Sequence, residues 1–512
     1  MFRWLKKQKN APEKAENTDA QDKKVLSKSL KNNRDTINTL FENVDTMLSR
    51  EFHNARQPSL AFCIYYTDGV TDASLINEHI IKPLMLSEDI DPLHDVLTQV
   101  KNHVVMMNDV SQTCRIEKII GSITYGDTLL LIDGCDSALL FSSKSFQLRS
   151  LSEPEGERVL SGPREGFTEG IMTNLSLIRR RLRTNNLKIR MITKGKQTNT
   201  SVAVLYMDNI VNKNILNELY RRLETVNIDG ILDSNYIKEY IAERSFLGFN
   251  TVGTTERPDV VVGKLLEGRI ALVVDGTPVV LTLPYLFIEN FQSNEDYYMN
   301  TIYATLSRLL RIASFCFSVT IPAVYISLVA FHHEILPHAL MLNFAAERMG
   351  APLPAAVECF VMLILFDILR ETGIRMPNHI GQAMSIVGAL IIGQAAVEAK
   401  LVTAPMIIVV ALSGLTILLV PRLTTASQVG RYACLILSSL LGFIGLMVGV
   451  AVIIVHIINL KSFGVPMLTQ TDSLRFQEIK DIFIRAPWPK MLTRYKPLTD
   501  NIVRQTQNAS RK

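Results

Sequence analysis

The chain has 512 residues, too many for one hydrophobic core, and the length predicts about three structural units. Its net charge of +5 comes largely from the two ends: residues 1–32 carry nine Lys/Arg against four Asp/Glu, and residues 461–512 carry ten against four. Basic flanks beside membrane spans follow the positive-inside rule, an explanation we prefer to nucleic-acid binding. The six cysteines are scattered without any CxxC motif, which argues against a disulfide framework or a zinc site and indicates reduced thiols.

The N-terminal end is polar. Residues 1–30 contain almost no large apolar side chains, and we expect a disordered charged tail. The start, MFRWLKKQKN, is basic but no apolar run follows it, so we expect the first 300 residues to stay in the cytoplasm. Leu30–Phe52 shows helical spacing of apolar residues and predicts an amphipathic helix.

Two stretches of the first 300 residues repeat the same series of elements. The first series consists of the apolar run Ser59–Tyr66, an acidic turn and the predicted helix Ala73–Leu86. The second series consists of a strand ending at Tyr206, an acidic turn and the predicted helix Asn212–Val226. The two series align at a constant offset of 140 residues. This agreement in order and spacing indicates an internal duplication.

A second pair of matching segments extends the duplication. GDTLLLIDG at 126–134 and GRIALVVDG at 268–276 are apolar strands ending in Asp-Gly, the strongest short hairpin signal. We therefore predict two related α/β subdomains, at 31–150 and 160–300, joined by the Glu/Pro/Gly/Ser-rich linker Ser152–Gly166.

The sequence offers weak candidates for a chemical site. Asp68, Asp72, Asp133 and Asp136 lie in the turns and could bind a cation, but Asp also caps helices and turns, the role we prefer. There is no Walker loop, GxGxxG, GxSxG or HExxH motif, so we predict no catalytic residue, no cofactor and no enzyme. The cluster around His332–Glu334 and His338 is predicted to be an interfacial loop and not a metal site.

Beyond residue 308 the apolar residues run in blocks long enough to cross a bilayer. These blocks predict a multi-span α-helical membrane domain at 301–460. A basic cytosolic tail at 461–512 is expected to follow it. The predicted spans are Leu309–Phe331, Ile380–Ala399, Leu401–Val420, Tyr432–Asn459 and, with reservations, Pro352–Arg370. Arg308 and Arg311 are expected to extend to the cytoplasmic surface beside the first span.

Pro352–Arg370 carries charge that is costly in hydrocarbon. Glu358 and Asp367 are predicted on opposite faces of this helix. Arg370 can pair with Asp367 at i, i+3, and Glu371 with Arg375 at i, i+4. A packed, ion-paired structural helix and a role in an ion pathway both fit this pattern.

The helix Ile380–Ala399 has two distinct stripes at 100° per residue. Small and polar residues that allow close helix packing form the first: Gln382, Ser385, Ala389, Gly393 and Ala396. Bulkier residues form the opposite stripe: Met384, Val387, Ile391, Gln394 and Glu398. Repeated around an axis, the second stripe would line a pore that blocks ions by dewetting. From spacing alone, an orientation toward lipid fits the residues better.

These predicted spans do not give a consistent membrane topology. Arg422 and Arg431 place the predicted loop Pro421–Gly430 on the cytoplasmic side, and the basic tail requires the same side. Tyr432–Asn459 must then be a hairpin bent around Gly442–Gly449, or one span is miscounted.

Three blocks of the sequence resemble the A subunit of the GerA-type spore germinant receptors. They are EGRIALVVDGTPVVLTLPYLFIENFQSNEDYY (267–298), ETGIRMPNHIGQAMSIVGALIIGQAAVEAKLV (371–402) and DIFIRAPWPKML (481–492), within a similarity that extends from about residue 30 to 500. The resemblance implies a cytosolic two-part N-terminal region, a multi-span membrane domain and a cytosolic C-terminal tail. It also implies the inner membrane of the dormant spore as the location.

The resemblance further implies partners and a function. Members of this family are expected to assemble with a transporter-like B subunit and a lipoprotein C subunit, to self-associate as a ring, and to pass monovalent cations when a nutrient binds. In such a ring the Met384–Glu398 stripe becomes a predicted pore lining. A secondary transporter and a membrane-anchored scaffold subunit are the alternatives, and no repeat in the membrane part supports the transporter.

Overall fold

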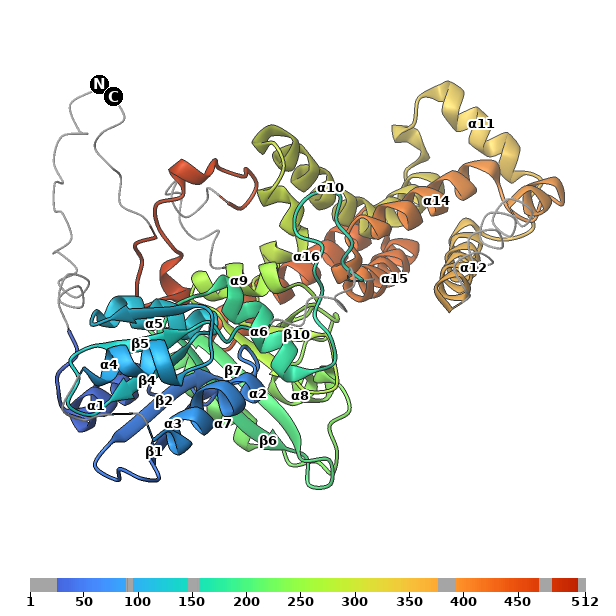
Figure 1. The fold of residues 1–512 in the computed structure, drawn as a ribbon. Helices are drawn as coiled ribbons and strands as arrows, with labels where there is room; N and C mark the ends of the chain where they lie inside the picture. The colour runs from blue at the N-terminus through green and yellow to red at the C-terminus, as the bar shows by residue number, and fades with distance from the viewer. Residues whose placement is uncertain are drawn as a thin grey trace, which may run out of the picture.

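The computed structural model describes residues 25–88, 90, 95–145, 154, 156–375, 393–468 and 481–504. Two sheets with their helices form one part of the molecule, and the helices that follow residue 300 extend from it (Figure 1). The chain therefore has an α/β half and a helical half, as the sequence predicted.

The first sheet has five strands in the order β1-β2-β4-β5-β3. The strands are β1 (Met47–His53), β2 (Ala61–Thr67), β3 (Val110–Thr113), β4 (Thr128–Ile132) and β5 (Ala138–Phe141). The α-helices are α1 (Leu30–Leu40), α2 (Ala73–Ile76), α3 (Lys82–Leu86), α4 (Val96–Gln99) and α5 (Ile116–Tyr125); the π-helical turns η1 (Asn77–Ile81) and η2 (Val100–Val104) join or follow them. All of its strand pairs are antiparallel.

The second sheet has the same strand order, β6-β7-β9-β10-β8. Its strands are β6 (Leu187–Lys194), β7 (Thr200–Met207), β8 (Gly253–Thr255), β9 (Ile270–Val274) and β10 (Val280–Leu283). Its helices are α6 (Ile171–Arg181), α7 (Lys213–Glu224), α8 (Ser234–Ile241) and α9 (Pro258–Leu266). The two predicted Asp-Gly hairpins are confirmed as β4–β5 and β9–β10.

The duplication extends to individual hydrogen bonds. Asp133 accepts from the backbone N–H of Leu30 at the start of α1 (3.0 Å), and Asp275 accepts from Ile171 at the start of α6 (3.1 Å). These carboxylates occupy helix N-termini, where exposed N–H groups and the helix dipole favour negative charge. Asp72 likewise caps α2. The capping role predicted for Asp72 and Asp133 is thus what the structure shows.

One predicted helix is too long. Leu30–Phe52 was expected to be a single helix, but α1 ends at Leu40 and β1 begins at Met47. Asn43 adopts a positive φ of 62° in the turn between them. Pairing of β1 with β2 provides hydrogen-bond partners for the backbone N–H and C=O groups of Met47–His53. This pairing outweighs the helical spacing of the side chains.

The helical half begins with the 3-10 turns η3 (Phe287–Phe291) and η4 (Asn294–Tyr297). Its helices are α10 (Thr301–Ile326), continued by the π turn η5 (Ser327–Phe331), then α11 (His338–Arg348), α12 (Ala355–Arg375), α14 (Ala404–Leu418), α15 (Thr424–Leu441) and α16 (Phe443–Asn459). Short turns η6 (His333–Ile335), η7 (Pro421–Leu423), η9 (Trp488–Lys490) and η10 (Lys496–Leu498) and the hairpin β11 (Lys461–Ser462) and β12 (Val465–Pro466) complete it. We name α10, α12, α14, α15 and α16 the bundle.

Within the described residues, Thr301–Phe331 is the one helix long and apolar enough to cross a membrane. Helices Ala404–Leu418 and Pro421–Leu441 meet this criterion as a pair, but the break between them bends by 109°. The apolar helix Phe443–Asn459 is shorter, with 17 residues.

The predicted single helix Tyr432–Asn459 is a hairpin, which was the first of the two alternatives. Gly442, with a φ of 61°, ends α15 and precedes α16, and the two helices pack against each other. The predicted loop Pro421–Gly430 is wrong, because helix α15 already begins at Thr424. The start of α15 and the end of α16 therefore lie at the same end of the bundle.

Gly445 allows this hairpin to close. A Cβ atom there would lie 1.9 Å from the backbone oxygen of Leu437, so Gly445→Ala should destabilise the protein by about 1–3 kcal/mol through overpacking. Gly121→Ala in α5 is the control, because nothing lies within 4 Å of its added Cβ. Thermal unfolding of the detergent-solubilised protein measures both. Equal melting temperatures for the two variants would contradict a close contact at Gly445.

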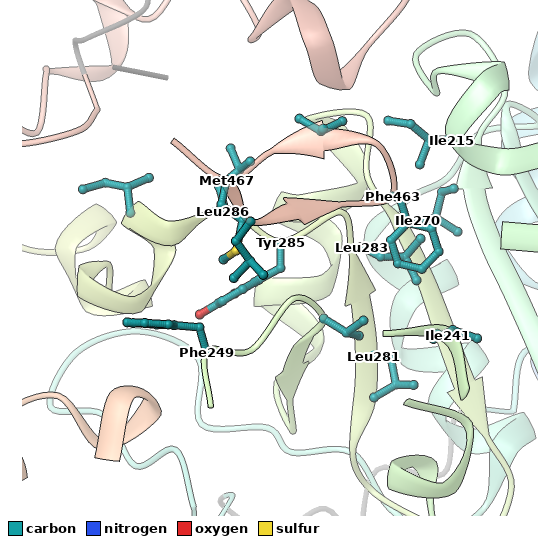
Figure 2. Close-up of a cluster of buried hydrophobic side chains, with 14 of the residues drawn as sticks. Ile215, Ile241, Phe249, Ile270, Leu281, Leu283, Tyr285, Leu286, Phe463 and Met467 are labelled. Atoms are coloured by element: carbon teal, nitrogen blue, oxygen red, sulfur yellow. The ribbon is translucent and has the colours of Figure 1, made fainter. Parts of the chain in front are cut away.

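The second sheet and the bundle share one hydrophobic core. Side chains of β7, β9 and β10 pack in the same cluster as residues of α10, α15 and α16. Figure 2 shows Phe463, from the β11–β12 hairpin, beside Leu283 and Ile270, and Met467 next to Leu286. The α/β half is therefore packed directly on the helices.

Candidate functional site: a charged junction and a buried helix pair

A network of buried ion pairs lies where the second sheet meets the bundle. Glu289, in η3, is 2 % exposed, accepts a hydrogen bond from Lys264 of α9 and forms an ion pair with Arg269, whose guanidinium lies 2.5 Å away. It also accepts from the backbone N–H of Leu286 (2.8 Å). A buried carboxylate is tolerated only when its oxygens are paired in this way.

The pairing determines how Glu289 titrates. Burial alone would raise its pKa, but Arg269 and Lys264 outweigh burial and hold the pKa below the ordinary 4.5. Its contribution to stability is therefore fully present above pH 4.5 and is lost as the pH falls through the folded-state pKa. We expect Glu289→Gln to melt below the parent protein at pH 7 and this difference to shrink below pH 4.5. Melting curves from pH 3 to 8, with Glu371→Gln as an exposed control, check this; a constant difference would contradict it.

A second group of charges joins α10 to the C-terminal segment 481–504. Arg308 is completely buried and its guanidinium contacts Asp296 (3.1 Å) and Asp481 (2.9 Å). Arg311 contacts the same Asp296 at 3.0 Å. The predicted extension of these arginines to the cytoplasmic surface is wrong. The first turns of α10 pack under η4 and the C-terminal segment, so the carboxylates of those elements replace water.

Tyr297 and Arg485 complete this contact. The Tyr297 hydroxyl donates to Asp481 (2.6 Å), and burial together with the neighbouring carboxylate raises the pKa of Tyr297 well above its ordinary value. Arg485 donates to the Tyr297 carbonyl (3.2 Å) and to Thr301 Oγ1 (3.2 Å). The blocks 267–298 and 481–492, which carry the sequence resemblance, thus meet in the structure. We name Glu289, Asp296, Arg308, Arg311 and Asp481 the junction cluster.

Two of the cavities near the junction cluster lie against α10. A polar cavity of about 440 Å³ lies between the second sheet and the bundle; Arg257, Arg311, Arg422 and Glu157 are among its lining residues. Arg422, at the start of η7, contacts Glu157 of the linker at 2.7 Å. The second cavity, of about 290 Å³, is apolar and is lined by Phe287, Phe291 and Phe315 together with side chains of α10 and α16.

Glu358 links the starts of two bundle helices. It is completely buried in the first turn of α12, and its Oε1 accepts from the backbone N–H (2.5 Å) and hydroxyl (2.8 Å) of Thr403, the N-cap of α14. The dipoles of both helices favour negative charge at this point. Its second oxygen has no partner in the described part of the chain.

Asp367 pairs across helices. The predicted pair Arg370–Asp367 is wrong, because Asp367 on α12 accepts from Arg431 on α15 at 2.9 and 3.1 Å and from the Tyr432 hydroxyl at 2.7 Å. Arg431 is 1 % exposed. Both distances are from Arg431 Nη2, and this charge-assisted contact of a buried guanidinium is stronger than an i, i+3 pair on an exposed face. The predicted pair of Glu371 with Arg375 is confirmed at 2.7 Å, exposed to solvent.

Most of the predicted pore helix lies outside the described residues. This applies to Met384, Val387 and Ile391 of one stripe and to Gln382, Ser385 and Ala389 of the other. Of the remaining members, Gln394 and Glu398 are exposed, and Gly393 is half-buried with nothing within 4 Å of its Cβ position. No described contact brings them to Glu358 or Asp367.

Sequence reasoning missed the junction cluster. Its residues lie at 289–311 and at 481, and the pairing of Arg308 with Asp481, 173 positions apart, depends on the return of the C-terminal segment. One signal was present: Asp296, Arg308 and Arg311 fall at helical spacing beside the first span. The same arginines also fit the cytoplasmic end of a membrane span, which is where the sequence predicts them.

Known proteins resemble this chain over most of its length. A sequence profile described as the Bacillus/Clostridium GerA spore germination protein matches residues 35–497. Spore germination protein KA of Bacillus subtilis is 39 % identical over 91 % of this chain and 86 % of its own. Spore germination protein B1 of the same organism is 36 % identical, over 90 % and 95 %. The crystal structure of the N-terminal domain of the A subunit of the Bacillus megaterium spore germinant receptor GerK3 is 32 % identical, covering 51 % of this chain and 97 % of that domain with a TM-score of 0.41.

Proposed function

Because the chain belongs to the GerA family of spore germination proteins, we propose that it is the membrane subunit of a nutrient receptor and that several copies form a channel for monovalent cations. Its role in germination follows from the family. The channel, the ring and the assembly with a transporter-like B subunit and a lipoprotein C subunit are our proposal. In it the protein signals and catalyses no reaction.

The outer surface of the bundle supports placement in a membrane. Large apolar side chains are exposed along the helices, among them Ile408, Leu415, Ile436, Leu440, Ile444 and Met447. The charges of Asp367 and Arg431 are turned inward and paired. An apolar exterior around paired charges is the pattern expected in lipid, so we place several bundle helices in the inner spore membrane. The proposed cytosolic parts are 1–30, 31–150, 160–300 and 461–512, with 301–460 in the membrane.

The proposed ring of subunits rests on one observation. Gln394 and Glu398 lie on one stripe at i, i+4 and are exposed in the single chain, beside apolar helices. A carboxylate facing lipid costs several kcal/mol, so these groups require water or another polar surface. A ring of copies around a water-filled axis would supply both the water and the polar surface of a neighbouring copy. The stripe then continues through Ile391, Val387 and Met384 as the apolar part of the pore.

Substitution of Val387 tests this proposal. Val387→Ala should widen the apolar ring, leak cations and trigger germination without nutrient, whereas Val387→Phe should not. Potassium release from spores, measured without nutrient and at matched receptor levels, gives the result. Release from Val387→Ala spores at the parent rate would mean that this stripe does not line the pore.

Two other functions give different results. A secondary transporter would show saturable nutrient uptake by this chain alone in proteoliposomes. A scaffold subunit would show no conductance in any stripe variant, while loss of the chain would abolish assembly of the receptor. Conductance of the reconstituted protein with and without its partners separates the three.

A further inference from the structure

A short loop of the α/β half is fixed against the bundle. Residues 242–250 follow α8, and Ser245 Oγ lies 3.1 Å from the His456 ring at the end of α16. The same hydroxyl accepts from the backbone N–H of Phe249 (2.9 Å). Asn250 donates to the carbonyl of Arg422 just before α15 (3.4 Å). The loop thus contacts the ends of both helices of the hairpin.

Gly248 brings the loop backbone close to α15. It has a φ of 78°, and a Cβ atom there would lie 2.8 Å from the methyl group of Thr425. Phe249 packs against the rings of Phe287, Phe315 and His456. Leu247 is also buried. These contacts fix the position of the loop along the axes of α15 and α16.

The residue between these anchors points outward. Phe246 is 86 % exposed, although Leu247 and Phe249 next to it are buried. Arg244 is exposed two residues earlier. On α8, Tyr236 and Tyr240 are one turn apart and are 40 % and 46 % exposed. Aromatic rings beside a basic side chain are the composition found at membrane–water interfaces.

The loop stands at the edge of the apolar exterior of the bundle. One turn into α16 from His456, on the same face, Val452 is 52 % exposed. One turn into α15 from Thr425, Val429 is 40 % exposed. Val455 and Ile458 of α16 are exposed as well (56 % and 54 %), so the exposed apolar surface of α16 extends to the helix end that contacts the loop, and that of α15 begins one turn from its own contact. The surface that would meet lipid runs directly up to Phe246.

We propose that Phe246 inserts into the headgroup region of the bilayer that surrounds the bundle, with Arg244 facing lipid phosphates. This contact is a lipid-binding surface on the α/β half, separate from the helices, and it rests on the membrane placement proposed above. Transfer of the exposed ring from water to the interface is favourable, and the anionic surface attracts the guanidinium. The contact sets how the α/β half lies on the membrane.

Tryptophan fluorescence in nanodiscs tests the insertion. The full-length Phe246→Trp protein is compared with the unsubstituted protein, whose two tryptophans give the background. We expect emission at shorter wavelength and quenching by lipids brominated near the headgroup. Met106→Trp is the control, because Met106 is exposed and lies far from the bundle. It follows α4 and η2 of the first sheet, and α4 lies far from α14 and α15 in Figure 1. It should emit as in water and remain unquenched.

A third variant separates this inference from the membrane placement. Val452→Trp should be quenched by lipids brominated along the acyl chain. If Val452→Trp is quenched and Phe246→Trp is not, the inference is overturned and the placement stands. If neither is quenched, the placement itself fails. A change at Phe246→Trp that appears only when a partner subunit is added would assign this surface to a protein and would also overturn the inference.

Lipid charge tests the role of Arg244. Quenching of Phe246→Trp should be stronger in nanodiscs of phosphatidylglycerol than in nanodiscs of phosphatidylcholine. Adding Arg244→Gln should remove most of that difference and leave the melting temperature unchanged. Equal quenching in the two lipids would overturn the proposed contact with phosphate.

Discussion

Replacing Asp367 by alanine should destabilise the protein by about 3–5 kcal/mol, because Arg431 would remain buried without a counter-charge. Arg431 is 1 % exposed, and Asp367 is the acidic partner that the described residues give it. Thermal unfolding in detergent, together with the yield of folded protein, measures the effect.

Two variants show whether the loss comes from the unpaired charge. Asp367→Leu combined with Arg431→Met removes both charges, and we expect it to recover most of the stability. Glu371→Ala on the same helix breaks the exposed pair with Arg375 and should cost less than about 1 kcal/mol. A double variant as unstable as Asp367→Ala would show that the shape of these side chains matters more than their charge.

Arg308→Ala should loosen the start of the C-terminal segment 481–504, around Asp481, from α10. The substitution leaves Asp481 without its buried arginine and weakens the hold on Asp296. Loss of one partner of a buried pair costs about 3–5 kcal/mol, enough to loosen the chain around Asp481, while Arg485, Thr499 and Arg504 still hold the rest of the segment. Limited proteolysis, read by mass spectrometry, should show faster cleavage after residue 481.

Arg311→Ala is the matched comparison. Asp296 keeps Arg308 in that variant, so the segment should stay docked and cleavage should be close to the parent rate. Arg308→Lys retains the charge but cannot reach both carboxylates as a planar guanidinium does, and it should fall between the two. Equal protection of segment 481–504 in the Arg308→Ala and parent proteins would show that the charged contact does not hold it.

The α/β half was largely predictable from sequence because its signals are local. The Asp-Gly turns predicted both hairpins, and the constant offset predicted a duplication that the structure extends to Asp133 and Asp275. The error at Leu30–Phe52 has a physical cause. Alternating and helical spacing overlap in short apolar runs, and the pairing of β1 with the next strand, β2, resolves the ambiguity only in the folded protein.

The charged sites were less predictable because pairing between helices leaves no local pattern. Asp367 has Arg370 at a suitable spacing, yet its partner is Arg431, 64 residues away. Arg308 likewise finds Asp481 at a separation of 173 residues. The hairpin at Gly442 was foreseen as an alternative because the basic residues on both sides required it. The pore assignment stays a prediction, since Val387 lies outside the described residues.

The common core of the second sheet and the bundle restricts how the α/β half can move. Val202 and Leu281 belong to the same packed cluster as Val319 and Ile453, so no hinge separates the sheet from α10 and α16. A rotation of the sheet must tilt these helices as one rigid body. A small rotation of the second sheet would therefore produce a larger displacement at the far ends of the helices, because displacement grows with distance from the pivot.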